Sequence, residues 1–290
     1  LISCKFAFIR MGFINKILPN KFKPLSRDIG FLSNAIIYKI KCIRRKTHSY
    51  PILILGNQKS GTSVISGLLG EISSKKTAID LFYSGFKYSL FLKWKDKKIS
   101  TKEFINKNKI EFAYEIIKEP HFSVFYQELK SQFPHSKFVM IIRNPFDNIR
   151  SILDRLDIDG NKENLEDSDK KKIFHSWNLV FDNHWIGGEK TQYIEVLSER
   201  WNIICNTYLE NKKDMILIKY EDFLLNKEEI IKILSSKLKL DNNKEISHLL
   251  EKQFQIKGRK KDVDLTEFFG GENYQRIESI CKENMKKLGY

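Results

Sequence analysis

The residues of this 290-residue chain that are best suited to chemistry lie in a polar loop at 57–63, between an apolar run at 51–55 and an apolar helix pattern at 62–73. A strand that enters a helix through such a loop forms an anion site, because backbone N–H groups converge there and the helix dipole adds partial positive charge. Lys59 supplies a full charge. We therefore expect a phosphate-bearing nucleotide to bind the loop residues, which are Asn57, Gln58, Lys59, Ser60, Gly61, Thr62 and Ser63.

The loop has the glycine spacing of a Walker A loop but not its lysine position. A Walker A loop reads G-x-x-x-x-G-K-[ST], with the lysine directly after the second glycine. Gly56 and Gly61 have this spacing, whereas Thr62 stands in the lysine position and Lys59 comes before the glycine. Taken alone, the loop leaves two alternatives open: a phosphate site of another kind, or an ordinary strand–turn–helix with an incidental lysine.

A second segment places an arginine and a serine across a strand–helix junction. The apolar run at 138–142 is typical of a buried parallel strand, and Arg143 follows it at the edge where ligands of open α/β sheets bind. Pro145 suits the first turn of a helix, which places Ser151 about two turns along that helix. Because guanidinium binds phosphate through two parallel charged hydrogen bonds, Arg143 and Ser151 form a second candidate phosphate site.

The two segments together resemble the nucleotide-binding motifs of PAPS-dependent sulfotransferases. The loop is similar to their 5′-phosphosulfate loop, [KR]-S-G-T-[ST], and residues 143–151 have their 3′-phosphate motif, R-N-P-x-D-x-x-x-S. The resemblance implies that Arg143 and Ser151 hold the 3′-phosphate of PAPS, the sulfuryl donor, which leaves as PAP. It is closest to the bacterial, carbohydrate and tyrosylprotein branches, and by motif it covers residues 50–225.

Three shorter segments agree with this resemblance. Lys118 begins K-E-P-H, which resembles a K-x-P segment whose lysine points at the sulfuryl group. Tyr220 begins Y-E-D-F, which resembles a segment that lies near the nucleotide. Arg259 lies in K-G-R-K-K, which resembles in a different order the basic loop over the 3′-phosphate; a solvated basic turn is the alternative. Tyr220 and Arg259 are therefore added to the expected nucleotide contacts.

Sulfuryl transfer from PAPS builds negative charge on the oxygen that bridges the sulfuryl group and the leaving nucleotide. A fixed cation beside that oxygen accelerates the reaction if it binds the transition state more strongly than the ground state. Lys59 is the first candidate for this cation, and Lys118 is the second, by resemblance. We expect no metal ion to take part.

A base that removes the acceptor's proton would assist the reaction. In tyrosylprotein and carbohydrate sulfotransferases a glutamate some seventeen residues beyond the loop has this role, and Asp80 is the one carboxylate in the matching region, 77–82. Asp80 is therefore the candidate base, with an N-cap or a solvated aspartate as the alternative. His121 is the second candidate, because cytosolic sulfotransferases use a histidine base, although in a different sequence context.

The acceptor is expected, by analogy with the family alone, to be a carbohydrate or glycolipid that offers a hydroxyl or an amine. Residues 80–111 and 155–200 are the segments expected to bind it. Two other functions stay open: a P-loop kinase-like enzyme that uses ATP and magnesium, and a catalytically inactive basic adaptor of the same fold. Aromatic residues of these segments would either stack on sugar rings or belong to the core: Phe82, Tyr83, Phe86, Tyr88, Phe91, Trp94, Trp177 and Trp185.

The net charge is +15, which a polyanionic donor and an acidic glycan would both draw on; a lysine-rich composition throughout is the alternative explanation. We expect no nucleic-acid partner. Residues 1–50 are interpreted as a basic helical extension that packs on the domain or makes peripheral contact with a membrane, and residues 51–290 as one sulfotransferase domain. Four scattered cysteines and the lack of an eighteen-residue apolar run favour a cytoplasmic location with reduced thiols.

Strands that alternate with helices predict a three-layer α/β/α domain around a central, mostly parallel sheet. Residues 95–110 are expected to be an exposed loop or helix, and residues 157–170 an acidic loop. Strands are predicted at 51–55, 112–117, 137–142 and 214–219. Helices are predicted at 62–73, 121–132, 145–156, 170–185, 190–211, 226–239 and 243–254.

Overall fold

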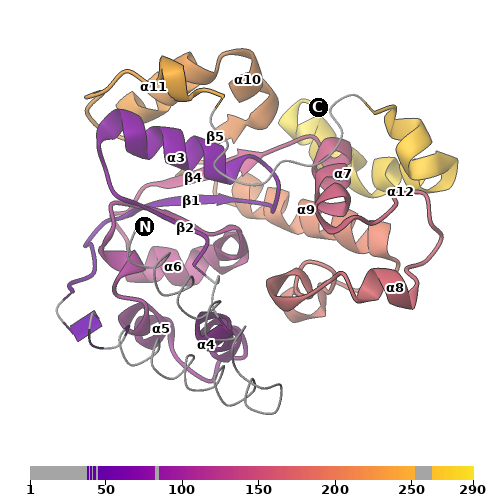
Figure 1. Ribbon diagram of the computed structural model, residues 1–290, viewed down its shortest axis with the longest axis horizontal. Coiled ribbons are helices and arrows are strands. Elements are labelled where there is room, and N and C mark those ends of the chain that lie inside the picture. Colours follow the sequence, from indigo (N-terminus) through magenta and orange to yellow (C-terminus); the bar gives the residue numbers. More distant parts are fainter. Residues whose placement is uncertain (1–37, 39, 41, 44, 82–84, 252–262) are drawn as a thin grey trace, which may run out of the picture.

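The fold is built on a five-stranded parallel sheet. The computed structural model describes residues 38–251 and 263–290, apart from 39, 41, 44 and 82–84. Hydrogen-bonded neighbours follow the order β2-β3-β1-β4-β5, and every pairing is parallel. Figure 1 shows this sheet between helices. The strands are β1 (Ile52–Gly56), β2 (Thr77–Ile79), β3 (Ile116–Lys118), β4 (Phe138–Ile142) and β5 (Met215–Lys219).

The helices cover both faces of the sheet and form the outer layers. α3, α10 and α11 lie on one side, and α6 and α9 on the other (Figure 1). The α-helices are α3 (Thr62–Ser73), α4 (Gly85–Lys95), α5 (Thr101–Lys107), α6 (Tyr126–Gln132), α7 (Pro145–Leu156), α8 (Asp167–Lys170), α9 (Tyr193–Glu210), α10 (Tyr220–Leu225), α11 (Lys227–Lys237) and α12 (Leu265–Leu288).

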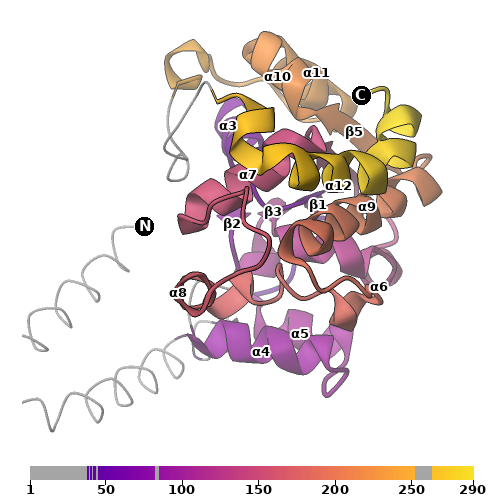
Figure 2. The same ribbon diagram turned by 90° about the vertical axis from the view of Figure 1, so that its right-hand side faces the viewer.

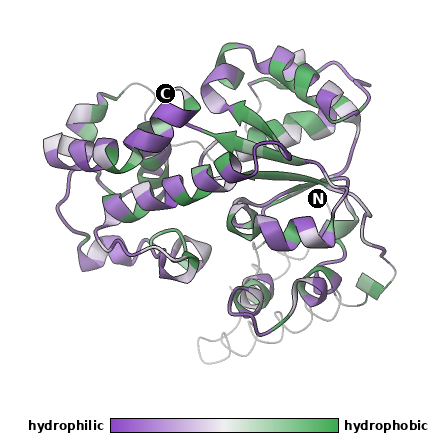
Figure 3. Ribbon diagram, turned by 180° about the vertical axis from the view of Figure 1, so that it is seen from behind, coloured by the Kyte–Doolittle hydropathy of each residue, from purple (hydrophilic) through white to green (hydrophobic). Residues whose placement is uncertain are grey.

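Alternate residues of β1 face two separate hydrophobic cores. Leu53 and Leu55 belong to the core on the α6 and α9 side, whereas Ile52 and Ile54 belong to the core on the α3 and α11 side. This alternation follows from the two-residue period of a strand that is buried on both faces. Figure 3 shows the strands as predominantly hydrophobic ribbon. The predicted three-layer α/β/α fold with its parallel sheet is confirmed.

The two helices that carry the predicted nucleotide motifs have the expected bounds. α3 spans Thr62–Ser73 and α7 spans Pro145–Leu156. Pro145 occupies the first turn of α7, and the Asn144 side chain accepts a hydrogen bond from the Phe146 N–H (3.0 Å). Proline and an asparagine cap fix a helix start locally, which is why the sequence predicted this boundary.

Several predicted elements are wrong in type or extent. In place of a helix at 170–185 the chain forms 3-10 turns at His175–Trp177 and His184–Ile186, where polar side chains bind backbone groups instead: Asp182 accepts from the His184 N–H and Asn183 donates to the Val196 carbonyl. Of the predicted helix 243–254, the described part contains one 3-10 turn, Ser247–Leu249. The acidic loop predicted at 157–170 ends in α8.

The region around β3 differs from its prediction in extent. A strand was expected at 112–117, but Glu111–Ala113 is a 3-10 turn and only Ile116–Lys118 pairs in the sheet. The helix expected at 121–132 begins as the 3-10 helix Pro120–Phe125 before α6. α5 forms within 95–110 and buries Phe104 and Ile105, so that segment is not simply exposed.

The sequence did not predict α12, the long helix near the end of the chain. α12 packs on α9 and α7, and Figure 2 shows α12 beside α9. Gly270 has non-helical angles (φ 67, ψ 162) inside this helix, and the Gly270–Gly271 pair interrupts the sequence pattern. Across the part of the chain that the structure describes, no helix is long and apolar enough to span a bilayer.

Candidate functional site

The predicted nucleotide-binding segments meet at one edge of the sheet. The carboxyl ends of parallel strands lie together, and this is where open α/β sheets bind ligands. The β1–α3 loop, Lys118 at the end of β3, Arg143 after β4 and Tyr220 after β5 are all at this edge. We call it the carboxyl edge. Segments that are far apart in sequence therefore form one site.

The loop backbone presents a positive helix end to the carboxyl edge. Lys59 (φ 66) and Gly61 (φ 86) both adopt the left-handed conformation. Among the described residues no side chain caps the N-terminus of α3, so its first N–H groups are available to an anion. The lack of a side chain at Gly61 lets the Tyr220 ring pack closely against the loop, because a Cβ at position 61 would lie 2.2 Å from that ring. Tyr220 thus forms a wall of the loop.

Asn148, a buried residue of α7, holds the loop in shape. Its Nδ2 atom donates to the Gln58 carbonyl (2.8 Å) and to Ser60 Oγ (3.0 Å), and its Oδ1 atom accepts from Asn57 Nδ2 (2.8 Å). Asn148 belongs to the second motif, so it links the two candidate phosphate sites directly. Asn148 was not among the residues predicted from the sequence, although its place between Arg143 and Ser151 was a signal.

Two hydroxyls of the loop are buried at the start of α3. Thr62 and Ser63 are both buried, and Ser63 Oγ has no hydrogen-bond partner among the described residues. A buried hydroxyl without a partner is costly. At an uncapped helix N-terminus this hydroxyl is suited to donate to a bound phosphate oxygen.

Arg143 is held beside the loop by four contacts. Nη1 donates to the Lys59 carbonyl (3.2 Å), Nη2 lies 3.6 Å from an Asp147 oxygen, and the guanidinium lies 4.9 Å from the centre of the Tyr220 ring. Trp201 Nε1 donates to the Arg143 carbonyl (2.8 Å). Ser151 is buried further along α7. The predicted arginine therefore contacts the predicted loop, and Ser151 lies on the helix whose Asn148 bonds to that loop.

Lys59 lies in a group of positive charges. Burial, followed by the charges of Arg155, Arg143 and Lys118, lowers the pKa of Lys59 to about 8. Asp154 opposes this shift but is the smallest of the named contributors. An excess of positive charge around a half-buried lysine is the environment that a polyanion would stabilise.

Arg155 is a candidate site residue that the sequence analysis missed. It follows Ser151 by four positions in α7, so the two share one helix face. It is exposed and has no ion pair with any described residue, whereas its neighbour Arg150 pairs with Asp154 (2.8 Å). Arg155 is also the largest charge contribution to the lowered pKa of Lys59. The four-residue spacing from Ser151 was the available signal.

Lys118 and Asp80 face each other across the pair of strands at the sheet edge. Ile79 is in register with Lys118, and the Asp80 N–H donates to the Lys118 carbonyl (3.1 Å). Nζ of Lys118 donates to Oδ1 of Asp80 (2.5 Å). The second candidate cation and the candidate base therefore form one ion pair at the carboxyl edge.

A family model described as a sulfotransferase domain matches residues 50–264. The chain belongs to the sulfotransferase family. α12, which begins at Leu265, follows the matched region. No match was found among curated proteins.

Solved structures with a similar fold include a sulfotransferase from Alicyclobacillus acidocaldarius (14% identity, 81% of this chain and 96% of that chain, TM-score 0.42). A sulfotransferase from Mycobacterium avium aligns at 12% identity over 93% of this chain and 86% of that chain (TM-score 0.48). Retinol dehydratase in complex with androsterone and the inactive cofactor PAP aligns at 15% identity over 88% of this chain and 85% of that chain (TM-score 0.44).

His121, the second candidate base of this sulfotransferase, is buried. Its Nδ1 atom lies 2.9 Å from Glu119 Oε1, and the Gln58 amide nitrogen lies 3.3 Å from Nε2 and 3.4 Å from Nδ1. The ring therefore has protein partners on the loop and at the end of β3. The structure places Asp80, which is half-buried, in a more accessible position than His121.

The two segments expected to bind the acceptor pack against each other. The Tyr88 hydroxyl of α4 donates to the His175 carbonyl (2.9 Å), and the rings of Phe91 and Trp185 are 6.3 Å apart. The Phe91 ring also lies 5.3 Å from His121. Phe91 and Trp94 belong to the core, as one alternative predicted. Phe82, Tyr83 and the expected nucleotide contact Arg259 lie outside the described residues.

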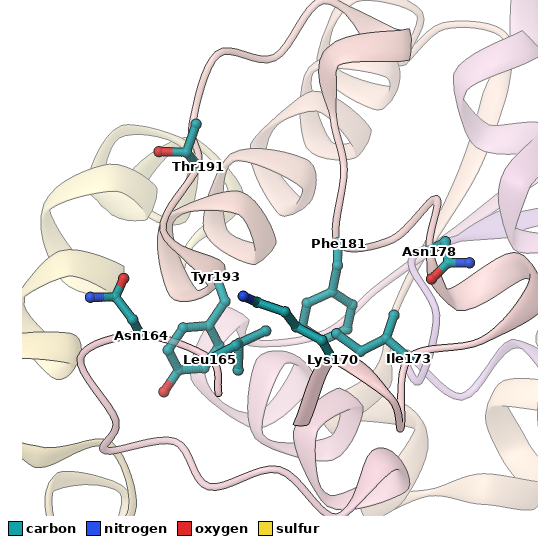
Figure 4. A pocket seen from close by; sticks show the side chains of 8 residues that line it. All are labelled: Asn164, Leu165, Lys170, Ile173, Asn178, Phe181, Thr191 and Tyr193. Carbon is teal, nitrogen blue, oxygen red and sulfur yellow. The ribbon is translucent and has the colours of Figure 1, made fainter. Parts of the chain in front are cut away.

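A cavity of about 540 Å³ lies within the second of these segments. This cavity is lined by the aromatic rings of Phe181 and Tyr193 and by the side chain of Lys170 (Figure 4). Polar amide and hydroxyl groups complete the lining, which consists of Asn164, Leu165, Lys170, Ile173, Asn178, Phe181, Thr191 and Tyr193. None of these residues belongs to the loop or to the 143–151 motif.

Proposed function

We propose that this sulfotransferase moves a sulfuryl group from PAPS to a hydroxyl or an amine of a carbohydrate or glycolipid acceptor. The observation that carries the proposal is that Arg143 and Asn148 of the second motif both bond to the Lys59 loop at the carboxyl edge. Two neighbouring candidate phosphate-binding elements suit a nucleotide that carries phosphate groups at both the 5′ and the 3′ position of its ribose. PAPS supplies the sulfuryl group when it binds.

The residues at the carboxyl edge fit such a donor. The N-terminus of α3, with the hydroxyls of Thr62 and Ser63, would bind the 5′-phosphosulfate, while Arg143 and Ser151 would bind the 3′-phosphate. Tyr220 lies against both Gly61 and Arg143, where it would border the nucleotide. Arg155 adds an exposed cation, without an ion pair among the described residues, to the same face of α7 as Ser151.

The catalytic roles follow from charge and accessibility. Lys59 and Lys118 would stabilise negative charge on the leaving nucleotide, because fixed cations in a partly buried site interact strongly with a developing anion. Asp80 would accept the proton of the acceptor group. Its carboxylate is half-buried at the carboxyl edge, whereas His121 is buried with its Nδ1 atom against Glu119.

The cavity beside α8 supports a carbohydrate acceptor. Aromatic rings, amides and a hydroxyl together suit a sugar, which has apolar ring faces and hydroxyl edges. Peripheral membrane contact through residues 1–50 stays a prediction, because most of that segment lies outside the described residues. The cytoplasmic location is likewise a prediction from the sequence.

One thermal-shift experiment separates this function from the two alternatives. A ligand that binds only the native state raises the melting temperature. We expect PAP to raise it without magnesium. Stabilisation by ATP with magnesium instead would favour a kinase-like enzyme, and stabilisation by neither would favour an inactive adaptor. A transfer screen with radiolabelled PAPS over glycans, glycolipids, phenols and peptides would then identify the acceptor class.

A further inference from the structure

Four buried polar side chains form a continuous chain from α9 through the loop to the end of β3. Arg200 Nε donates to Gln58 Oε1 (3.3 Å), the Gln58 amide nitrogen lies against the His121 ring, 3.3 Å from Nε2 and 3.4 Å from Nδ1, and His121 Nδ1 lies 2.9 Å from Glu119 Oε1. The exposed fractions are 0% for Arg200, 8% for Gln58, 4% for His121 and 3% for Glu119. Nδ1 of His121 is the ring nitrogen in contact with the Glu119 carboxylate, and the Gln58 amide packs on the same ring.

The chain ends on the turn that carries the candidate base. The second carboxylate oxygen of Glu119 accepts a hydrogen bond from the Leu81 N–H (2.9 Å). Asp80, the preceding residue, has a left-handed backbone (φ 56), a conformation that needs support from its surroundings. Glu119 therefore holds the backbone immediately after Asp80 while its other oxygen binds His121.

Arg200 gives this chain a feature that stability alone does not explain. The guanidinium has no carboxylate partner among the described residues, its Nη2 atom has no hydrogen-bond partner, and burial lowers its pKa to about 10. A buried, unpaired charge is costly. Its Nε donates to the carbonyl oxygen of the Gln58 amide, which polarises that amide and strengthens its N–H as a donor to His121.

We propose that Arg200, Gln58, His121 and Glu119 form a relay that couples occupancy of the donor loop to the geometry of the Asp80 turn. Gln58 is the member that belongs to the loop, and Glu119 is the positioning residue at the acceptor end. The proposal rests on the proposed function for the identity of the donor and for the role of Asp80. When the loop closes on a donor phosphate, Gln58 shifts with it, and the imidazole and carboxylate transmit the shift to Leu81.

NMR on leucine-labelled protein tests the relay with PAP as the probe. In the wild type, saturating PAP should shift the backbone amide signal of Leu81, and the signal of Leu288 at the end of α12 should stay in place. In Gln58→Ala, PAP should still bind at saturation but the Leu81 signal should no longer respond. His121→Phe removes the next link, should have the same effect, and serves if Gln58→Ala does not fold.

Asn284→Leu is the matched control, because it removes a buried amide of α12 whose hydrogen-bond partners, within the described part of the chain, are Asn202 and Asn206 of α9. It should lower the melting temperature and keep the Leu81 response. A Leu81 signal that still responds in Gln58→Ala and His121→Phe would overturn the relay. PAP binding to the wild type without a Leu81 response would also overturn it, while absence of PAP binding would contradict the proposed function as well.

The positioning role of Glu119 has its own test. Glu119→Gln keeps an oxygen that can accept from the Leu81 N–H, whereas Glu119→Leu removes it. Glu119→Leu should lower kcat about 100-fold, the scale of a small misplacement of a reacting group, while Glu119→Gln should restore most of it. PAP affinity should be the same in both variants. Equal loss of kcat in the two variants, or parallel loss of PAP affinity, would contradict positioning.

Discussion

The ammonium of Lys118 lies 2.5 Å from a carboxylate oxygen of Asp80, across the neighbouring strands β3 and β2. The side chain of Lys118 is 2% exposed and that of Asp80 is 42% exposed. A sulfuryl group would compete with Asp80 for Lys118, and an acceptor hydroxyl would compete with Lys118 for Asp80. Binding of both substrates would thus replace one ion pair with two productive contacts.

Asp80→Asn tests the base. The amide keeps the shape of the side chain but cannot take a proton at neutral pH, so transfer to a hydroxyl acceptor should fall by about 100-fold or more, the usual contribution of a general base. PAP affinity, measured by calorimetry, should change little. Asp241→Asn, at an exposed position after α11, is the matched control and should keep full turnover. Normal turnover in Asp80→Asn would move the base elsewhere, with Glu119 and Glu71 as the next carboxylates.

Lys59→Ala tests the catalytic cation. The charge of Lys59 matters most as negative charge develops on the leaving nucleotide, so kcat should fall by about 100-fold or more, the scale of losing one preorganised electrostatic donor. Steady-state kinetics with varied PAPS measures this directly. A raised KM for PAPS with unchanged kcat would instead make Lys59 a residue that binds the ground state only.

The lowered pKa of Lys59 predicts proton uptake when PAP binds. Lys59 is half deprotonated near pH 8 in the free protein, and a bound polyanion would favour its charged form. Calorimetry at pH 8 in buffers of different ionisation enthalpy should show uptake of about half a proton, which Lys59→Met should lack. Equal proton uptake in both proteins would contradict this assignment.

The lowered pKa of Lys59 also makes the stability of the folded protein depend on pH. The unfolded chain holds the Lys59 proton up to its ordinary pKa of 10.5, whereas the native protein releases it from about 8. Between these values the unfolded state binds more protons, so the free energy of unfolding rises with pH in that window. Relative to Lys59→Met, the wild type should therefore gain stability between pH 8 and 10.5. Denaturation at a series of pH values measures the difference.

Gly61→Ala tests the wall that Tyr220 forms beside the loop. The left-handed backbone costs a non-glycine residue about 1–3 kcal/mol, and the new Cβ would lie 2.2 Å from the Tyr220 ring. PAP affinity should fall about tenfold or more, since about 1.4 kcal/mol corresponds to a factor of ten. Gly271→Ala is the matched control, because nothing lies within 4 Å of its added Cβ. Equal affinity in the two variants would contradict a shaped loop.

Much of the donor site could be predicted because its signals are local in sequence. The loop, its helix and the Arg143–Ser151 segment each fold through short-range contacts, and parallel strands bring their ends together without further information. Arg155 and Asn148 lie in the same segment and could have been found from helix periodicity. The long helix α12 could not, because Gly270 and Gly271 break the pattern that would have indicated it.

The acceptor side depends on contacts between distant segments. The Lys118–Asp80 pair requires the register of β2 on β3, and β2 is only three residues long. The relay requires α9 to place Arg200 against Gln58, which lies 142 positions away in the chain. Neither pairing follows from periodicity or a short motif. The sequence could therefore predict Asp80, Lys118 and His121 only as separate residues, without their contacts.

The most direct test of the donor assignment compares PAP with AMP, which lacks the 3′-phosphate, on the wild type and on Arg143→Ala. If Arg143 holds the 3′-phosphate, its truncation should weaken PAP binding by about 2–4 kcal/mol, as expected for one partner of a desolvated charge pair, and AMP binding should hardly change. Calorimetry with both ligands gives the comparison. An equal loss for PAP and AMP, or wild-type protein that binds the two alike, would contradict the account.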